Sequence, residues 1–190
     1  MEGKLIIISA PSGCGKSTII GRIMDEGTRD LRFSVSATNR SPRPGEQHGV
    51  HYYFLSDEEF KSRVATGDFV EFEEVYPGRF YGTLRSEIES SLKSGHNIVL
   101  DIDVKGGVNV KRQFGDRAIS IFIEPPSIDA LRSRLEGRGT DSAEVIEERV
   151  GRAEYELSFA PQYDCRIIND NLDTAVRDTA EAIDSFITKK

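Results

Sequence analysis

Short apolar runs recur along the chain and alternate with patterns typical of helices. Four runs rich in β-branched residues lie at residues 5–8, 98–100, 119–123 and, more weakly, 166–168. Runs this short and this continuously apolar predict strands buried on both faces of a parallel sheet. Helical patterns begin near residue 16 and cover residues 84–93, 104–114, 127–136, 141–159 and 173–188. The alternation predicts an α/β fold built on a doubly wound parallel sheet.

The middle of the chain interrupts this alternation. Strand-like pieces lie at residues 33–36, 52–55, 69–75 and 79–81. A helical piece at residues 56–65 sits among them, and Ser56 and Glu59 have the spacing of a capping box at its start. We expect a small, partly antiparallel insertion on the main sheet.

Length, composition and charge narrow the class of protein. The 190 residues allow one substantial core but not two full domains. Hydrophobic residues make up 37% and charged residues 30%, which is ordinary for a folded globular chain. The net charge of −7 argues against nucleic-acid binding, so any phosphate site needs locally focused positive charge. No apolar run approaches the roughly 18 residues of a membrane span, and the two cysteines lie too far apart to indicate a disulfide framework. We expect a cytoplasmic protein without membrane or nucleic-acid partners.

A glycine-rich loop follows the first predicted strand and precedes a predicted helix. Residues 12–18 read Ser-Gly-Cys-Gly-Lys-Ser-Thr. Residues 10–17 match the phosphate-loop pattern Gly-x-x-x-x-Gly-Lys-Ser/Thr except at Ala10, where the commonest form has glycine. Gly13 and Gly15 let successive backbone N–H groups curl inward around an anion at the helix N-terminus. The alternative is a glycine-rich turn without a ligand, and the strand–loop–helix order favours the phosphate site.

The side chains of this loop carry their own predictions. Lys16 would reach the β and γ phosphates, and the Ser17 hydroxyl would bind Mg²⁺, which prefers oxygen ligands. Cys14 is either an inert small side chain or a thiol whose pKa is lowered by the loop dipoles, and we favour the first. The predicted triphosphate site consists of Ser12, Gly13, Cys14, Gly15, Lys16, Ser17 and Thr18. The loop alone leaves the second substrate open.

Further segments, in order along essentially the whole chain, resemble the motifs of guanylate kinases. Residues 36–46, Ser-Ala-Thr-Asn-Arg-Ser-Pro-Arg-Pro-Gly-Glu, resemble the loop that holds the phosphate of GMP, and Gly-Val-His-Tyr-Tyr-Phe follows at 49–54. The other matching segments are 69–71 and 80–83 for guanine, 101–103 for the Mg²⁺ side, 134–140 for the lid and 168–170 for the adenine side.

The resemblance implies an organisation and an activity. It implies a P-loop core at about 1–33, 84–126 and 160–190, a mixed α/β GMP-binding insertion at 34–83 and a helical lid at 127–159. The implied reaction is reversible phosphorylation of GMP, and by extension dGMP, by ATP with Mg²⁺, in purine nucleotide metabolism. The implied partners are these small molecules, while the formation of a homo-oligomer stays open.

Two arginines and two tyrosines form the implied site for the phosphate of GMP. Arg40 and Arg43 are three residues apart on a proline-containing loop, so both guanidinium groups can close on one phosphate. An isolated pair of this kind is more often a solvated basic surface. The resemblance implies that Arg40 and Arg43 hold the phosphate with hydroxyls from Tyr52 and Tyr81, and that Ser36 lies near the base.

Guanine presents two adjacent donors, N1–H and N2–H₂, and a carboxylate can accept from both. Strand alternation puts Glu71 and Glu73 on one face, and Glu74 lies beside them, so the residues alone leave the choice open. The resemblance implies Glu71, with Thr83 donating to O6 and Asp103 at the guanine edge.

The remaining implied positions surround the triphosphate. Asp101 ends an apolar strand and would hold a water on Mg²⁺. Arg134 and Arg138 share a helical face, and with Arg149 they would close over the transferring phosphoryl group as a lid. The resemblance places Asn169 on the adenine side. Arg132 and Arg152 are expected to be surface charges.

Two rival functions remain at this stage. The first is a kinase for another nucleoside monophosphate. The second is a non-catalytic guanylate-kinase-like module that binds phosphorylated peptides. The intact Gly15, Lys16 and Ser17 and the lid arginines argue against the second, because a binding module needs neither.

Overall fold

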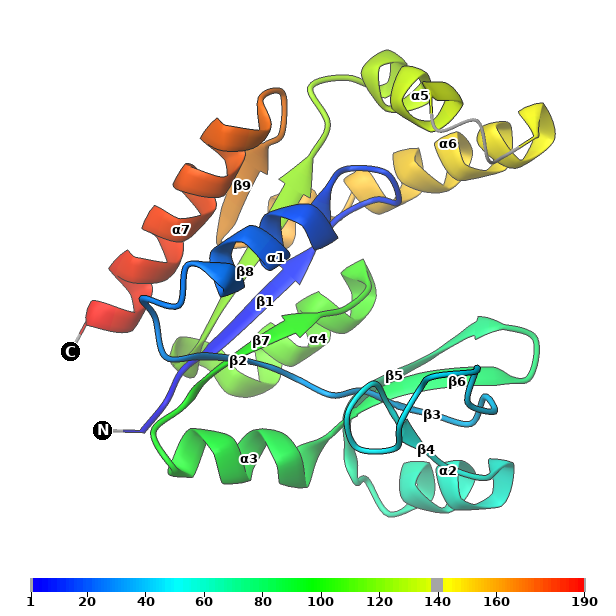
Figure 1. Ribbon diagram of the computed structural model, residues 1–190, viewed down its shortest axis with the longest axis vertical. Coiled ribbons are helices and arrows are strands. Elements are labelled where there is room, and N and C mark those ends of the chain that lie inside the picture. The colour runs from blue at the N-terminus through cyan, green and yellow to red at the C-terminus, as the bar shows by residue number, and fades with distance from the viewer. Residues whose placement is uncertain (1, 138–141, 190) are drawn as a thin grey trace.

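A five-stranded parallel sheet forms the centre of the computed structural model, which describes residues 2–137 and 142–189 (Figure 1). The strand order is β2 (Leu31–Phe33), β7 (Asn97–Asp101), β1 (Leu5–Ser9), β8 (Ala118–Glu124) and β9 (Cys165–Ile168). Every residue of β1 and β8 is buried, as the continuous apolar runs predict. The predicted α/β fold with a parallel sheet is confirmed.

Helices cover both faces of this sheet. One apolar cluster joins β1 and β8 to α1 (Lys16–Asp25) and α7 (Leu172–Thr188). A second cluster, on the opposite face, joins β1 and β7 to α3 (Arg85–Lys93) and α4 (Val104–Phe114). Two short 3-10 helices, Gly115–Arg117 and Ala160–Gln162, complete the connections.

The predicted insertion is a second, four-stranded sheet. Its order is β4 (Tyr53–Phe54), β3 (Ala37–Thr38), β6 (Arg79–Leu84) and β5 (Phe69–Tyr76), with β5 and β6 antiparallel. Helix α2 (Asp57–Ala65) packs Phe60 against Phe69, and the predicted capping box of Ser56 and Glu59 is present at its start.

The strand predicted at residues 33–36 is wrong beyond its first residue, because residues 34–36 connect the two sheets. The main sheet takes β2, which ends at Phe33, and the second sheet takes β3, which begins at Ala37. Ser34 N still donates to Val99 O of β7. The chain changes sheets within three residues, and a single apolar–polar pattern cannot show such a change.

The predicted lid consists of α5 (Ile128–Gly137) and α6 (Ala143–Leu157), which begins after the N-cap Ser142. Leu131 and Ile146 join the apolar cluster of α1 and β1, so both helices pack on the phosphate-loop side of the core. Figure 1 shows these helices and the second sheet on opposite sides of the carboxyl end of β1. In the described part of the chain, no helix is long and apolar enough to cross a membrane.

Candidate active site

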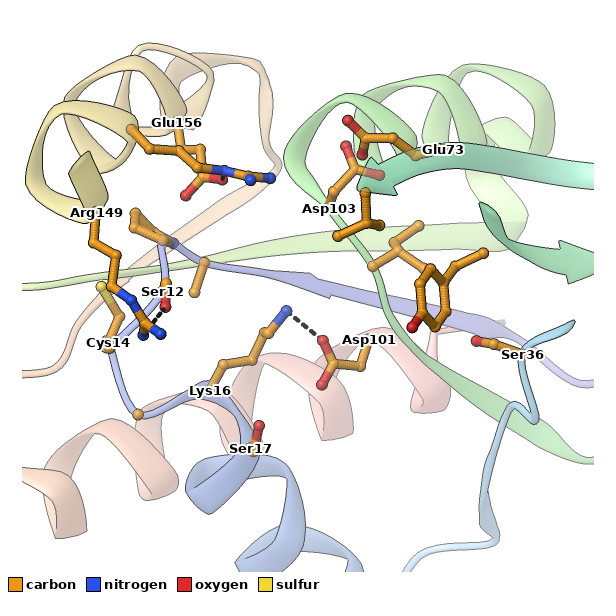
Figure 2. Close-up of a pocket in the computed structure, with 18 of the residues that line it drawn as sticks. Ser12, Cys14, Lys16, Ser17, Ser36, Glu73, Asp101, Asp103, Arg149 and Glu156 are labelled. Carbon is orange, nitrogen blue, oxygen red and sulfur yellow. Dashed lines mark hydrogen bonds and ion pairs between the residues drawn. The ribbon is translucent and has the colours of Figure 1, made fainter. Parts of the chain in front are cut away.

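A cavity of about 750 Å³ opens at the carboxyl ends of β1 and β7. The phosphate loop forms one wall, β5 and β6 form another, and α6 contributes a third. Figure 2 shows Ser12, Lys16 and Arg149 on one side, and Glu73, Asp103 and Ser36 on the other. Ligands of open α/β sheets bind at this end of the strands.

The phosphate loop has the backbone shape that its sequence predicts. Gly13 and Gly15 have φ values of 94° and 82°, in the left-handed region that favours glycine. Gly15 is the N-cap of α1 and offers no side chain to the first N–H groups of the helix, which stay open to an anion. Lys16 forms an ion pair with Asp101 at the end of β7. Ile8 of β1 pairs with Asp101 of β7 in the sheet, which places Asp101 beside the loop that follows β1.

Cys14 is buried in the apolar cluster beneath the loop. Burial raises the pKa of its thiol to about 12. The thiol is therefore neutral at physiological pH, which supports the interpretation of Cys14 as an inert small side chain.

Glu71 and Glu73 project from β5 into the cavity. Glu71 pairs with Thr83 across β5 and β6, and Thr83 Oγ1 donates to Glu71 Oε1 at 2.6 Å. Burial, with a smaller contribution from Asp103, raises the pKa of Glu71 to about 7. Burial also raises the pKa of Glu73, which contacts Asp103. Glu74 instead accepts from Gly78 N at 2.6 Å in the β5–β6 turn. Of the three carboxylates that the sequence leaves open as the expected guanine acceptor, Glu71 and Glu73 remain candidates.

Asp103 reaches the same cluster from another element. It is the N-cap of α4, where its Oδ1 accepts from Lys105 N at 2.8 Å and from Gly106 N at 3.1 Å. A Cβ at Gly106 would lie 2.8 Å from Asp103 Oδ2 and 3.1 Å from Glu71 Oε2. Glycine at this position allows the two carboxylates to approach each other, a requirement that the sequence pattern did not suggest.

Arg40 is held by a carboxylate that the sequence analysis left without a role. Its guanidinium group donates to both oxygens of Glu46, at 2.8 and 2.9 Å, and lies over the ring of Tyr52. Arg43 N also donates to Glu46, at 2.7 Å. These hydrogen bonds, chiefly from Arg40, lower the pKa of Glu46 to about 2. An acidic residue shortly after two arginines on one loop was the available signal.

The aromatic hydroxyls lie beside this arginine. Tyr52 and Tyr81 both line the cavity, and their ring centroids are 5.8 Å apart. Ser36 lines the cavity near them, whereas Arg43 is exposed on the loop.

The predicted lid arginines occupy different places. Arg149 lines the cavity from α6 and donates to Ser12 Oγ of the phosphate loop at 3.3 Å (Figure 2). Arg134 instead donates to Asn169 O at 2.8 Å. Arg138 lies outside the described residues.

Comparison with known proteins settles the family. The guanylate kinase family model matches residues 2–186. The chain belongs to the guanylate kinase family. A guanylate kinase from Bacteroides thetaiotaomicron is 54% identical over 190 residues, covering 100% of this chain and 93% of that relative. One from Porphyromonas gingivalis is 54% identical over 186 residues, covering 98% of this chain and 99% of the relative.

The fold comparison agrees. The crystal structure of guanylate kinase from Anaplasma phagocytophilum matches with a TM-score of 0.76 at 28% identity, over 100% of this chain and 88% of that one. This guanylate kinase family member is an enzyme that phosphorylates GMP with ATP.

Arg132 and Arg152 of the guanylate kinase lid were both expected to be surface charges. Arg152 is exposed, and it also lines the open cavity from α6 together with Glu156. Arg152 Nε donates to Glu156 Oε1 at 2.9 Å. Arg132, by contrast, pairs with Glu147 between α5 and α6. Arg132 is partly buried, so Arg152 meets the expectation of a surface charge more closely than Arg132 does.

Proposed function

We propose that the enzyme transfers the γ-phosphoryl group of Mg²⁺-bound ATP to the phosphate of GMP or dGMP within this cavity. The observation that carries the proposal is that Lys16, Glu71 and Tyr81 line one cavity. Lys16 begins α1 after the first strand of the main sheet, whereas Glu71 and Tyr81 lie in the second sheet. Phosphoryl transfer depends mainly on aligning two anionic substrates and stabilising the charge between them.

The triphosphate would bind along the loop. Backbone N–H groups of Gly13 and Gly15 would donate to its oxygens, and Lys16 would leave Asp101 to pair with the β and γ phosphates. Asn169 stays in the proposed ATP site, and Arg134 holds its segment through Asn169 O. Thr18 would complete the loop at the start of α1.

The oxygen ligands that the protein offers in the cavity fit a magnesium ion held mainly by substrate phosphates. The Ser17 hydroxyl and the Asp101 carboxylate both line it. Among residues 2–137 and 142–189, no group of three or more His, Cys, Asp or Glu side chains could hold a metal ion without substrate. Ser17 would bind Mg²⁺ directly and Asp101 through water. When bound, Mg²⁺ neutralises charge on the β and γ phosphates.

GMP would bind between the loop of Arg40 and strand β5. Glu71 would accept from N1–H and N2–H₂ of guanine, with Thr83 and Ser36 near O6 and Asp103 at the amino edge. Adenine has an unprotonated N1 at the corresponding position, which would face a carboxylate lone pair. An unpaired buried polar group costs about 1–3 kcal/mol, so the preference for guanine should be large.

The phosphate of GMP would meet the four side chains beside that loop. Arg40 is oriented by Glu46, and its Nε is buried without a hydrogen-bond partner in the described chain. With Arg43, Tyr52 and Tyr81, it would hold the acceptor phosphate facing the triphosphate. Arg149, and Arg138 from the segment outside the described residues, would then stabilise the transferring group.

A coupled ADP-release assay with GMP, dGMP, AMP and UMP, each with ATP and Mg²⁺, tests this proposal. We expect turnover with GMP and dGMP at rates far above those with AMP and UMP. If AMP or UMP turns over faster than GMP, the proposed roles of Glu71 and Thr83 are wrong. If EDTA leaves turnover unchanged, the proposed need for Mg²⁺ is wrong.

A further inference from the structure

Asn169 makes a long-range contact with the phosphate loop. It follows β9 directly, and only 6% of its surface is exposed. Its side-chain Nδ2 donates to the backbone oxygen of Cys14 at 2.8 Å, across 155 positions of sequence. This hydrogen bond is buried, so water does not compete for either partner.

The backbone of Asn169 is fixed from two sides. Asn169 N donates to Glu124 O at the end of β8, at 2.8 Å. Asn169 O accepts from Arg134 of α5, also at 2.8 Å. The side chain is thus presented to the loop from a rigid support that joins the sheet to the lid helices.

The fit against the loop is close. A Cβ at Gly15 would lie 2.6 Å from Asn169 Nδ2, nearer than van der Waals contact allows. Gly15 therefore serves two purposes, because its φ of 82° favours glycine and its missing side chain makes room for the amide.

The contact has a direct effect on loop geometry. A peptide unit is planar and trans, so its C=O and N–H groups point in opposite directions. Because Asn169 holds the Cys14 C=O on the outer side of the loop, the N–H of Gly15 in the same peptide unit points the opposite way. Gly15 lines the cavity, and an inward N–H there is one of the donors that a bound phosphate requires.

We propose that Asn169 is a positioning residue for the triphosphate, which acts by fixing the Cys14–Gly15 peptide unit. This role rests on the proposed function of the loop and differs from a contact with adenine. It predicts that loss of the amide weakens the binding of any polyphosphate, whether or not the ligand carries a base.

The test uses two variants and a matched control. Asn169→Ala removes the donor, and Asn169→Asp replaces it with an oxygen that repels the Cys14 carbonyl. Asn171→Asp makes the same chemical change two residues away, where Asn171 Oδ1 accepts from Thr174 N as an N-cap, a role that aspartate fills equally well. The measurements are KM for ATP, KM for GMP, the inhibition constant of inorganic tripolyphosphate against ATP, and the thermal midpoint.

We expect Asn169→Ala to raise both KM for ATP and the inhibition constant of tripolyphosphate by about tenfold, with KM for GMP within about twofold of its original value. Asn169→Asp should have a larger effect in the same direction, and Asn171→Asp should have none. A loss of ATP affinity with unchanged tripolyphosphate inhibition would show that Asn169 acts on adenine and would overturn the proposal. An equal loss of ATP and GMP affinity together with a lower thermal midpoint would show a merely structural role. If tripolyphosphate fails to compete with ATP in the unsubstituted enzyme, the assignment of the loop itself fails, and the inference fails with it.

Discussion

Replacing Glu71 with glutamine isolates the proposed recognition of guanine. The amide keeps the shape of the carboxylate but offers one acceptor and one donor, so it can satisfy only one of the two guanine donors. The other guanine N–H would then face an N–H₂ group in a site that excludes most water. Thr83 Oγ1, 2.6 Å from Glu71 Oε1, can still donate to the amide oxygen and would favour that orientation.

The expected loss follows from these contacts. A hydrogen bond to a charged group contributes about 1.5–3 kcal/mol, and a buried unpaired donor adds a further cost. A total of about 3 kcal/mol corresponds to a decrease of roughly 100-fold in kcat/KM for GMP. The decrease should appear mainly in KM, because the proposed contacts of Arg40 and Tyr81 with the phosphate of GMP would be unchanged.

Two neighbouring carboxylates provide matched comparisons. Glu74→Gln alters the same strand, but Glu74 accepts from Gly78 N in the turn, and the amide oxygen can replace it. Glu73→Gln alters the other carboxylate of β5 that lines the cavity. If Glu71→Gln changes kcat/KM for GMP less than threefold while Glu73→Gln lowers it 100-fold, Glu73 is the guanine acceptor and our reasoning is refuted.

Glu71→Gln should lower kcat/KM for GMP, but it should raise the stability of the folded protein above about pH 7. Burial raises the pKa of Glu71 from 4.5 to about 7 in the folded state. The folded protein therefore binds more protons than the unfolded one between these values, and stability falls as the pH rises through this window. A rise of this size corresponds to about 3 kcal/mol above pH 7. Glu71→Gln should remove this loss, so thermal midpoints at pH 5 and pH 8 should differ less in the variant. In the unsubstituted enzyme, KM for GMP should rise as the pH falls below about 7, because the proposed contact of Glu71 with guanine needs the carboxylate form.

Three further predictions concern the loop and the arginines. Lys16→Ala should lower kcat by about 100- to 1,000-fold while the calorimetric affinity for GMP stays unchanged; unaltered turnover would exclude Lys16 from the reaction. Glu46→Gln should leave Arg40 less firmly oriented and raise KM for GMP several-fold with little change in KM for ATP, and the reverse pattern would contradict the positioning role of Glu46. Iodoacetamide at pH 8, followed by mass spectrometry, should leave Cys14 unmodified in the folded enzyme, and Cys14→Ala should keep its activity; rapid labelling of Cys14 would show that the loop opens to solvent.

The sequence predicts the parts of the fold that depend on local pattern. Continuous apolar runs predict β1, β7 and β8, because strands buried on both faces carry little polar alternation. Residues 104–114 form a helix with the predicted bounds, since its apolar spacing and the Asp103 N-cap agree. The local pattern does not show that β2 and β3 are separate short strands in different sheets. The sheet that each one joins depends on partner strands far away in the sequence.

Prediction of the site from the sequence has the same limit, because contacts between distant segments cannot be read from local motifs. Lys16 and Arg40 belong to recognisable local motifs, and their partners Asp101 and Glu46 could be named or at least suspected from sequence. Asn169 could not be connected with Cys14, because that contact depends on β9 lying next to β8 and on the missing side chain of Gly15. Local motifs in the sequence thus identify many of the groups that would touch the substrates. Some of the groups that orient them, such as Asn169, come from elements that meet only in the folded chain, so identifying them requires the structure.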